Sequence, residues 1–154
     1  MVRLEQDELR PADELERFIA CLDGDGAVVS FVGLARPADQ AGSKVTGLLL
    51  DSYPGMTEAS LETIATDARA RFAVSAVAIA HRCGAVAPGA PIVFAAAAAP
   101  HRRAAFEAAD YLMDRLKTDA AFWKREDGVD GARWIEPGEA DRADRARWSD
   151  PCPE

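Results

Sequence analysis

Two lysines give the clearest chemical signal in this sequence. The chain contains fifteen arginines but only three lysines, and Lys117 and Lys124 lie seven residues apart around the aromatic residues Phe122 and Trp123. A lysine that is buried or close to other cations can lose its proton and act as a base or nucleophile, whereas arginine stays protonated. The alternative is that both are solvated, or that Lys124 lies along Trp123 by its aliphatic stem. Their rarity makes them candidate catalytic residues.

A second cationic cluster consists of His101, Arg102 and Arg103, at the start of the longest predicted helix. Unpaired backbone N–H groups and the helix dipole favour an anion such as a phosphate or carboxylate at this end of a helix. Arg36, in a predicted loop, is a third candidate for anion binding. The alternative for all of them is ordinary surface charge.

The spacing of the two clusters restricts how they can cooperate. His101 and Lys117 are 16 residues apart in a predicted helix, which separates them by about 24 Å at 1.5 Å per residue. They cannot line the same small pocket within one chain. A site that contains both must therefore be built across an interface between two copies, as in a two-fold dimer.

Hydrophobic periodicity predicts the elements that position these residues. It indicates helices at 11–22, 57–71 and 101–120, strands at 27–33, 45–53, 74–84 and 90–100, and a small hairpin from 121–126 and 132–136. The five alanines at 95–99 would suit a helix, but they follow a β-like run and end at Pro100, so a strand is expected. This order predicts an α+β domain with a mostly antiparallel sheet flanked by helices and a small C-terminal β hairpin.

Length and composition indicate one domain that can form its core without disulfides or metals. The chain has 154 residues, of which 49% are hydrophobic. We expect a single domain over 1–154, with 1–10 and 142–154 peripheral or flexible. The net charge of −8 argues against nucleic acid or an anionic membrane as a partner.

The remaining signals concern location and metals. No secretory signal and no apolar stretch of about 20 residues is present, so a cytoplasmic protein is expected. Cys21, Cys83 and Cys152 are odd in number and form no CxxC motif, which fits a reducing compartment without structural disulfides. With only His81 and His101 in the chain, no metal site is predicted.

Several segments together resemble the large, catalytic subunit of molybdopterin synthase. They are GAVVSFVGLAR, YPGMTEASL, HRCGAVAPGAPIVF, HRRAAFEAADYLMDRLKTDAAFWKRE and the pair RW at 133–134. The match covers roughly residues 26–135, and the spacing of LKT and FWKRE is specific.

The resemblance implies a fold, a reaction and a set of partners. The fold is an α/β hammerhead type of α+β domain. The activity is a sulfurtransferase of molybdenum cofactor biosynthesis that needs no cofactor of its own. A homodimer binds two small ubiquitin-like carriers, forming a heterotetramer. Each carrier ends in Gly-Gly with a terminal thiocarboxylate, whose sulfur is transferred to cyclic pyranopterin monophosphate to form the dithiolene of molybdopterin.

The resemblance also assigns roles to individual residues. Lys117 matches the lysine beside the carrier's terminal carbonyl, and Lys124 matches a second essential lysine. Arg36, His101 and Arg102 match contacts to the anionic substrate, with His101 and Arg102 coming from the other protomer. Such a cationic ring would stabilise developing negative charge and lower the pKa of the lysines. Additional pocket residues are expected to be Phe31, Arg103, Met113 and Arg125.

The sequence departs from the family pattern in the details of the substrate contacts. PADQAGSK follows Arg36 where an asparagine- or histidine-containing loop is common, Pro100 precedes His101, and no basic residue occurs in IEPGEA. The alternative function is a non-catalytic module that binds the carrier or a pterin phosphate. Such a module would tolerate arginine at positions 117 and 124, whereas the enzyme would not.

Overall fold

The computed structural model describes residues 1–39 and 41–149, so Cys152 and the end of the predicted C-terminal periphery lie outside the described residues. The described chain forms, in order, β1 (Val2–Glu5), α1 (Pro11–Ala20), β2 (Ala27–Leu34), β3 (Val45–Ser52), α2 (Met56–Arg71), β4 (Ala76–Arg82), β5 (Gly84–Val86), β6 (Pro91–Ala99), α3 (Arg102–Thr118), β7 (Phe122–Gly128), β8 (Gly131–Ile135) and α4 (Glu139–Ala146). No helix in this part of the chain is long and apolar enough to span a bilayer.

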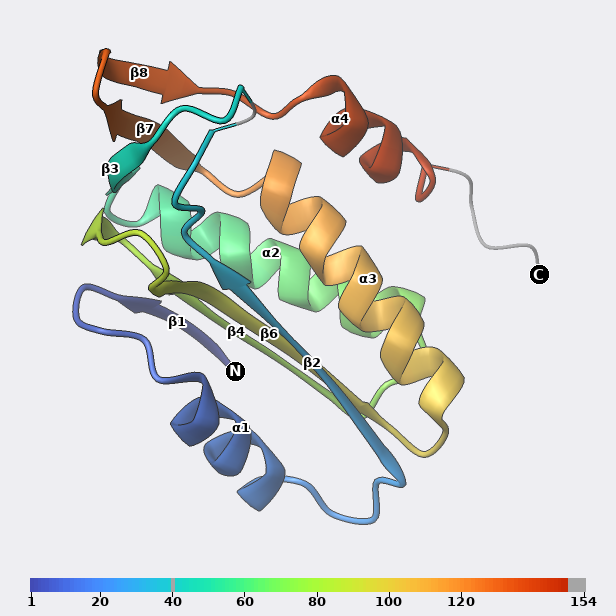
Figure 1. Ribbon diagram of the computed structural model, residues 1–154. Coiled ribbons are helices and arrows are strands. Elements are labelled where there is room, and N and C mark those ends of the chain that lie inside the picture. Colours follow the sequence, from blue (N-terminus) through green and yellow to red (C-terminus); the bar gives the residue numbers. More distant parts are fainter. Residues whose placement is uncertain (40, 150–154) are drawn as a thin grey trace.

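A four-stranded sheet in the order β1-β4-β6-β2 forms the centre of the molecule. Helix α1 covers one face, while α2 and α3 cover the other (Figure 1). Only the pairing of β1 with β4 is parallel, and the other two pairings in this sheet are antiparallel. The predicted α+β class with a mostly antiparallel sheet is confirmed.

The alanine-rich strand β6 lies at the centre of this sheet and is buried on both faces. Ala95 and Ala97 pack into the core under α2 and α3, while Ala96 and Ala98 pack on the α1 side with Phe94. This alternation is the period of two that a β-strand requires. Burial on both faces also explains the uninterrupted apolar run. The prediction of a strand over a helix is therefore confirmed.

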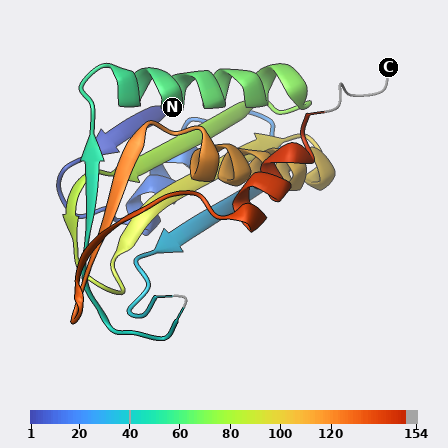
Figure 2. The ribbon, with the colours of Figure 1, turned by 90° about the horizontal axis from the view of Figure 1, so that it is seen from above.

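A second antiparallel sheet, in the order β5-β3-β7-β8, lies at one end of the first (Figure 2). The predicted strand 74–84 is divided between the two sheets: β4 ends at Arg82, and the chain enters β5 at Gly84. Gly84 has a φ of 82°, a left-handed conformation that glycine adopts without steric cost. The predicted C-terminal hairpin is present as β7 and β8, joined at 129–130.

Two elements, β1 and α4, were not predicted from the sequence. Strand β1 forms an edge of the central sheet, and the ammonium group of Met1 donates a hydrogen bond to the carbonyl of Val77 at 2.8 Å. Helix α4 lies against α3, and Trp148, just after it, packs edge-on against Phe72 and Tyr111. The chain after β8 therefore returns to α3, close to the catalytic candidates.

Candidate functional site

Lys124 lies in the middle of β7, paired with Leu50 of β3 on one side and with Ile135 of β8 on the other. Its side chain is half-buried. Burial lowers the pKa of this amine, the ammonium group of Lys117 lowers it further, and the carboxylate of Asp141 opposes the change. The alternative of a solvated surface lysine therefore does not hold for Lys124.

Lys117 lies in the last turn of α3, where the helix dipole favours a cation. Its side chain is exposed, and its Nζ is 3.3 Å from Oδ1 of Asp141. Because the charge of Lys117 acts on Lys124, the two lysines share one electrostatic environment. The structure thus brings together two of the three lysines of the chain.

Asp141, in the first turn of α4, is a member of this group that sequence reasoning missed. Its Oδ2 accepts a hydrogen bond from the backbone N–H of Gly138 at 2.9 Å, which satisfies one of the free N–H groups at the start of the helix. Burial opposes its ionisation, but the N–H of Gly138 and the charge of Lys117 outweigh burial and lower the pKa of Asp141. An acidic residue three positions after a glycine was the available signal for this cap.

His81 is a second missed neighbour of Lys124. It is buried near the end of β4, its ring stacks on Phe122 with 4.2 Å between the ring centroids, and its Nδ1 donates to the carbonyl of Arg82 at 2.7 Å. Burial lowers the pKa of His81 to about 4, although the hydrogen bond to Arg82 acts in the opposite direction, and Lys124 lowers it further. A neutral imidazole therefore lies near the amine of Lys124.

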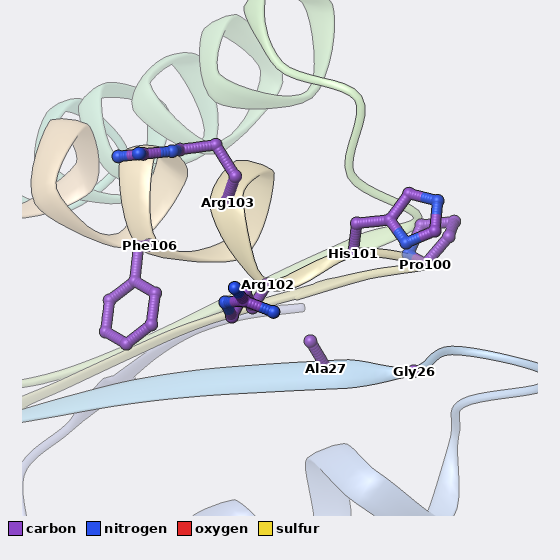
Figure 3. Close-up of a pocket in the computed structure, with 7 residues that line it drawn as sticks. All are labelled: Gly26, Ala27, Pro100, His101, Arg102, Arg103 and Phe106. Atoms are coloured by element: carbon purple, nitrogen blue, oxygen red, sulfur yellow. The ribbon is translucent and has the colours of Figure 1, made fainter.

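The second cationic cluster surrounds a pocket of about 740 Å³ at the start of α3, lined by Gly26, Ala27, Pro100, His101, Arg102, Arg103 and Phe106 (Figure 3). A Cβ atom on Gly26 would lie 2.6 Å from the carbonyl oxygen of Pro100, so this close approach requires glycine. In Figure 3 the side chain of Arg102 lies between the start of α3 and β2, whereas Arg103 projects away over the helix. Exposed cations and unpaired helix N–H groups make this pocket suited to an anion.

The two clusters lie at opposite ends of α3, as their spacing predicted (Figure 1). His101 immediately precedes this helix and Lys117 is in its last turn. Arg36, exposed just after β2, does not line the pocket that contains His101. One chain therefore does not bring the predicted anion-binding residues and the lysines into a single pocket.

The additional pocket candidates occupy different environments. Phe31 is exposed on the edge strand β2, and Met113 packs partly buried against the main core. Arg125 follows Lys124 in β7, so its side chain lies on the opposite face of the strand. It pairs with Asp127 at 2.9 Å and lies over the ring of Trp134.

Within this chain, burial and then the ammonium group of Lys117 lower the pKa of Lys124. The contribution expected from guanidinium groups includes Arg102 of a second protomer and stays a prediction. Among residues 1–39 and 41–149, no three His, Cys, Asp or Glu side chains gather as a group that could hold a metal ion.

Comparison with known proteins identifies the family. The sequence profile of the MoaE protein family matches residues 4–119. A molybdopterin synthase catalytic subunit from Caulobacter vibrioides is 49% identical over 148 residues, covering 96% of this chain and 97% of that protein.

Solved structures agree with the sequence match. The molybdopterin biosynthesis MoaE protein of Burkholderia ambifaria superposes with a TM-score of 0.82 at 39% identity, covering 97% of this chain and 98% of that one. Molybdopterin synthase from Staphylococcus aureus has a TM-score of 0.74 at 28% identity, covering 87% and 94%. The chain therefore belongs to the MoaE family.

Proposed function

We propose that this chain is the catalytic subunit of molybdopterin synthase. It transfers sulfur from the C-terminal thiocarboxylate of a small ubiquitin-like carrier to cyclic pyranopterin monophosphate, in two successive transfers that form the dithiolene. Family membership supports this assignment, and so does the name of the relative that is 49% identical along nearly the whole chain. The term "catalytic subunit" in that name also supports a separate carrier chain.

The observation that carries the proposal is the environment of Lys124. A half-buried amine whose pKa is lowered by burial and by a neighbouring ammonium group can exchange protons under conditions where ordinary lysines cannot. Lys117, exposed beside it, supplies a cation that can stabilise negative charge on the carrier's terminal carbonyl as sulfur is transferred. A module that only binds the carrier has no need of an amine with a lowered pKa.

In this proposal, the substrate phosphate binds at a site that contains residues from two copies of the chain. His101 and Arg102 of one protomer would reach the lysines of the other, and Arg36 would add a third cationic contact. The placement of the two clusters at opposite ends of α3 supports this arrangement. So do the exposed apolar residues Phe31 and Val32 on the edge strand β2, because exposed apolar edges are typical of interfaces.

The reaction in this proposal needs no resident metal or cofactor, since the carrier supplies sulfur and the pterin supplies the carbon atoms. We place it in the cytoplasm. The odd number of cysteines and the absence of a CxxC motif support a reducing compartment.

Reconstitution tests the function directly. The purified chain is mixed with a thiocarboxylated carrier that ends in Gly-Gly and with cyclic pyranopterin monophosphate, and dithiolene is measured after oxidation to a fluorescent pterin. Product that depends on all three components supports the catalytic assignment. Carrier binding without product, when the thiocarboxylate content is verified by mass spectrometry, would establish the binding module instead.

A further inference from the structure

The start of α4 places a carboxylate against the lysine pair. Asp141 uses both of its oxygens: Oδ2 accepts the backbone N–H of Gly138 at 2.9 Å, and Oδ1 lies 3.3 Å from Nζ of Lys117. Exposed ion pairs generally contribute little because both side chains are mobile. Here the capping hydrogen bond fixes the carboxylate, so the position of Lys117 is restrained by a group that is itself held in place.

Contacts further along the C-terminal segment hold α4 on α3 and therefore fix Asp141 relative to the lysines. Arg145 pairs with Asp119 at 2.9 Å, immediately beyond the end of α3. Asp114 accepts from Arg147 and from the indole N–H of Trp148, both at 2.6 Å. These contacts follow one another along α3, and the ion pair of Asp141 with Lys117 belongs to the same series.

We propose that Asp141 is a positioning residue for sulfur transfer, which pairs with Lys117 and holds its ammonium group beside Lys124. This inference rests on the proposed function of the same site. Asp141 does not touch the reacting atoms in this proposal. It acts through Lys117, and its negative charge also acts on Lys124 across the same cluster.

The charged groups around Lys124 determine what the loss of Asp141 would do. Lys117 faces it from α3 and Asp141 from α4, while His81 of β4 is neutral because burial lowers its pKa to about 4. Lys117 lowers the pKa of Lys124 and Asp141 raises it. Removal of the carboxylate charge therefore leaves Lys117 unopposed, and the amine of Lys124 should lose its proton at lower pH.

The test uses Asp141→Asn, which keeps an oxygen for the Gly138 cap but removes the charge, and Asp141→Glu, which keeps the charge. Glu139→Gln is the matched control, because it removes an exposed negative charge from the same turn of α4. Protein labelled with ¹⁵N-lysine gives signals for only three side chains. The Nζ titration of Lys124 is followed by NMR in the full-length chain, and kcat/KM is measured against pH with carrier and cyclic pterin.

For Asp141→Asn we expect the titration of Lys124 and the acidic limb of kcat/KM to move to lower pH together. We also expect kcat to fall about tenfold because the ammonium group of Lys117, which stays near Lys124, is no longer held in one orientation, with carrier affinity unchanged. Asp141→Glu should restore the pH profile, and Glu139→Gln should match the wild type. A purely structural role would change the melting temperature without moving either titration.

Two failures are distinguishable. If the Lys124 titration in Asp141→Asn coincides with that of Glu139→Gln, the assignment of Asp141 is overturned whether or not the enzyme turns over. If the titration moves as expected but the wild-type chain makes no dithiolene from a loaded carrier, the proposed function fails and the electrostatic coupling of Asp141 to the lysines stands.

Discussion

At the scale of single residues, the environment of the Lys124 amine determines which chemistry the site can perform. Lys124 lies between two neighbouring strands, near the neutral His81 and the cationic Lys117. Both burial and the neighbouring charge disfavour its ammonium form. A residue whose charge is disfavoured in the folded state lowers stability, and such a cost is common where a function requires it.

Replacement of Lys124 by methionine should therefore stabilise the fold while it abolishes activity. Methionine has a similar length, fills irregular gaps and carries no charge. We expect the free energy of unfolding at pH 7 to rise by about 1 kcal/mol, measured by urea denaturation, with no detectable dithiolene. Lys44→Met, at the exposed third lysine, is the control and should change neither quantity. A destabilised Lys124→Met protein would contradict the unfavourable environment inferred for the ammonium group.

His81 should make the stability depend on pH. Its pKa is about 4 in the folded chain and about 6.5 when unfolded, so the unfolded state binds the extra proton between these values. The stabilisation by neutral His81 is complete above pH 6.5 and is lost as the pH falls toward 4, by about 3 kcal/mol. The substitution His81→Asn, which keeps a donor near the position of Nδ1, should remove this dependence.

Urea denaturation of the wild type and of His81→Asn at pH 7 and pH 4 measures this effect. The carboxylates titrate in both proteins, so only the difference between the two pH dependences reports on His81. Equal losses of stability in the two proteins would contradict a histidine that is buried in its neutral form.

Sequence reasoning identified some of the residues at this site and missed others for a physical reason. Lys117 and Lys124 stand out because arginine replaces lysine almost everywhere else. Asp141 and His81 carry no such signal, since acidic residues are common in this chain and a histidine in a strand is usually structural. Their importance comes from pairing between segments distant in sequence, which spacing along the chain does not reveal.

At the scale of elements, α4 and Trp148 after it connect the lysine site to the main core. Trp148 packs against Phe72 and Tyr111, its indole donates to Asp114, and its carbonyl accepts from Arg71. None of the residues Glu139–Ala146 is buried. The helix therefore depends on Trp148 and on the ion pairs to α3 for its position.

Trp148→Ala should detach α4 and leave the sheets intact. We expect a local loss of about 2 kcal/mol, less than for a fully buried tryptophan, and hence roughly thirtyfold faster amide exchange in 139–146. Hydrogen–deuterium exchange with mass spectrometry measures this, with Arg142→Ala on the exposed side of the same helix as the control. Unchanged exchange in α4 would show that the ion pairs alone hold it.

The strength of the hydrophobic pattern explains which elements were predictable. Strand β6 was predicted because a β-like run precedes its alanines and Pro100 follows them, and both of its faces are buried. Strand β1 has only four residues, too few for a period to be visible. Helix α4 has only alanines, at 140, 143 and 146, on its apolar side, so its position follows from tertiary contacts and not from its own sequence.

At the scale of the whole molecule, the separation of the two cationic clusters means that a site containing both, as we propose, must be shared by two chains. The N-terminal end of α3 carries His101 and Arg102, and its C-terminal end carries Lys117. This separation was predictable from a count of residues and the rise of a helix. The face on which two copies would meet was not, because it depends on which apolar residues the fold leaves exposed.

Complementation between two inactive variants tests this arrangement. His101→Ala and Lys117→Ala proteins are each expected to be inactive as homodimers. After they are unfolded and refolded together, half of the dimers are mixed, and each mixed dimer has one intact site of two if the site is shared. We therefore expect about one quarter of wild-type activity. No recovery, with mixed dimers verified by tagged subunits, would place both residues in a site within one chain.

The most direct measurement for the central claim is single-turnover dithiolene formation by Lys124→Arg, with carrier affinity determined in parallel. Arginine keeps the positive charge but cannot give up its proton. We predict normal carrier affinity and a rate at least about a hundredfold lower, the usual effect of losing a general acid or base, while Lys44→Arg keeps the wild-type rate. A Lys124→Arg protein that forms dithiolene at the wild-type rate would contradict a catalytic amine at this position.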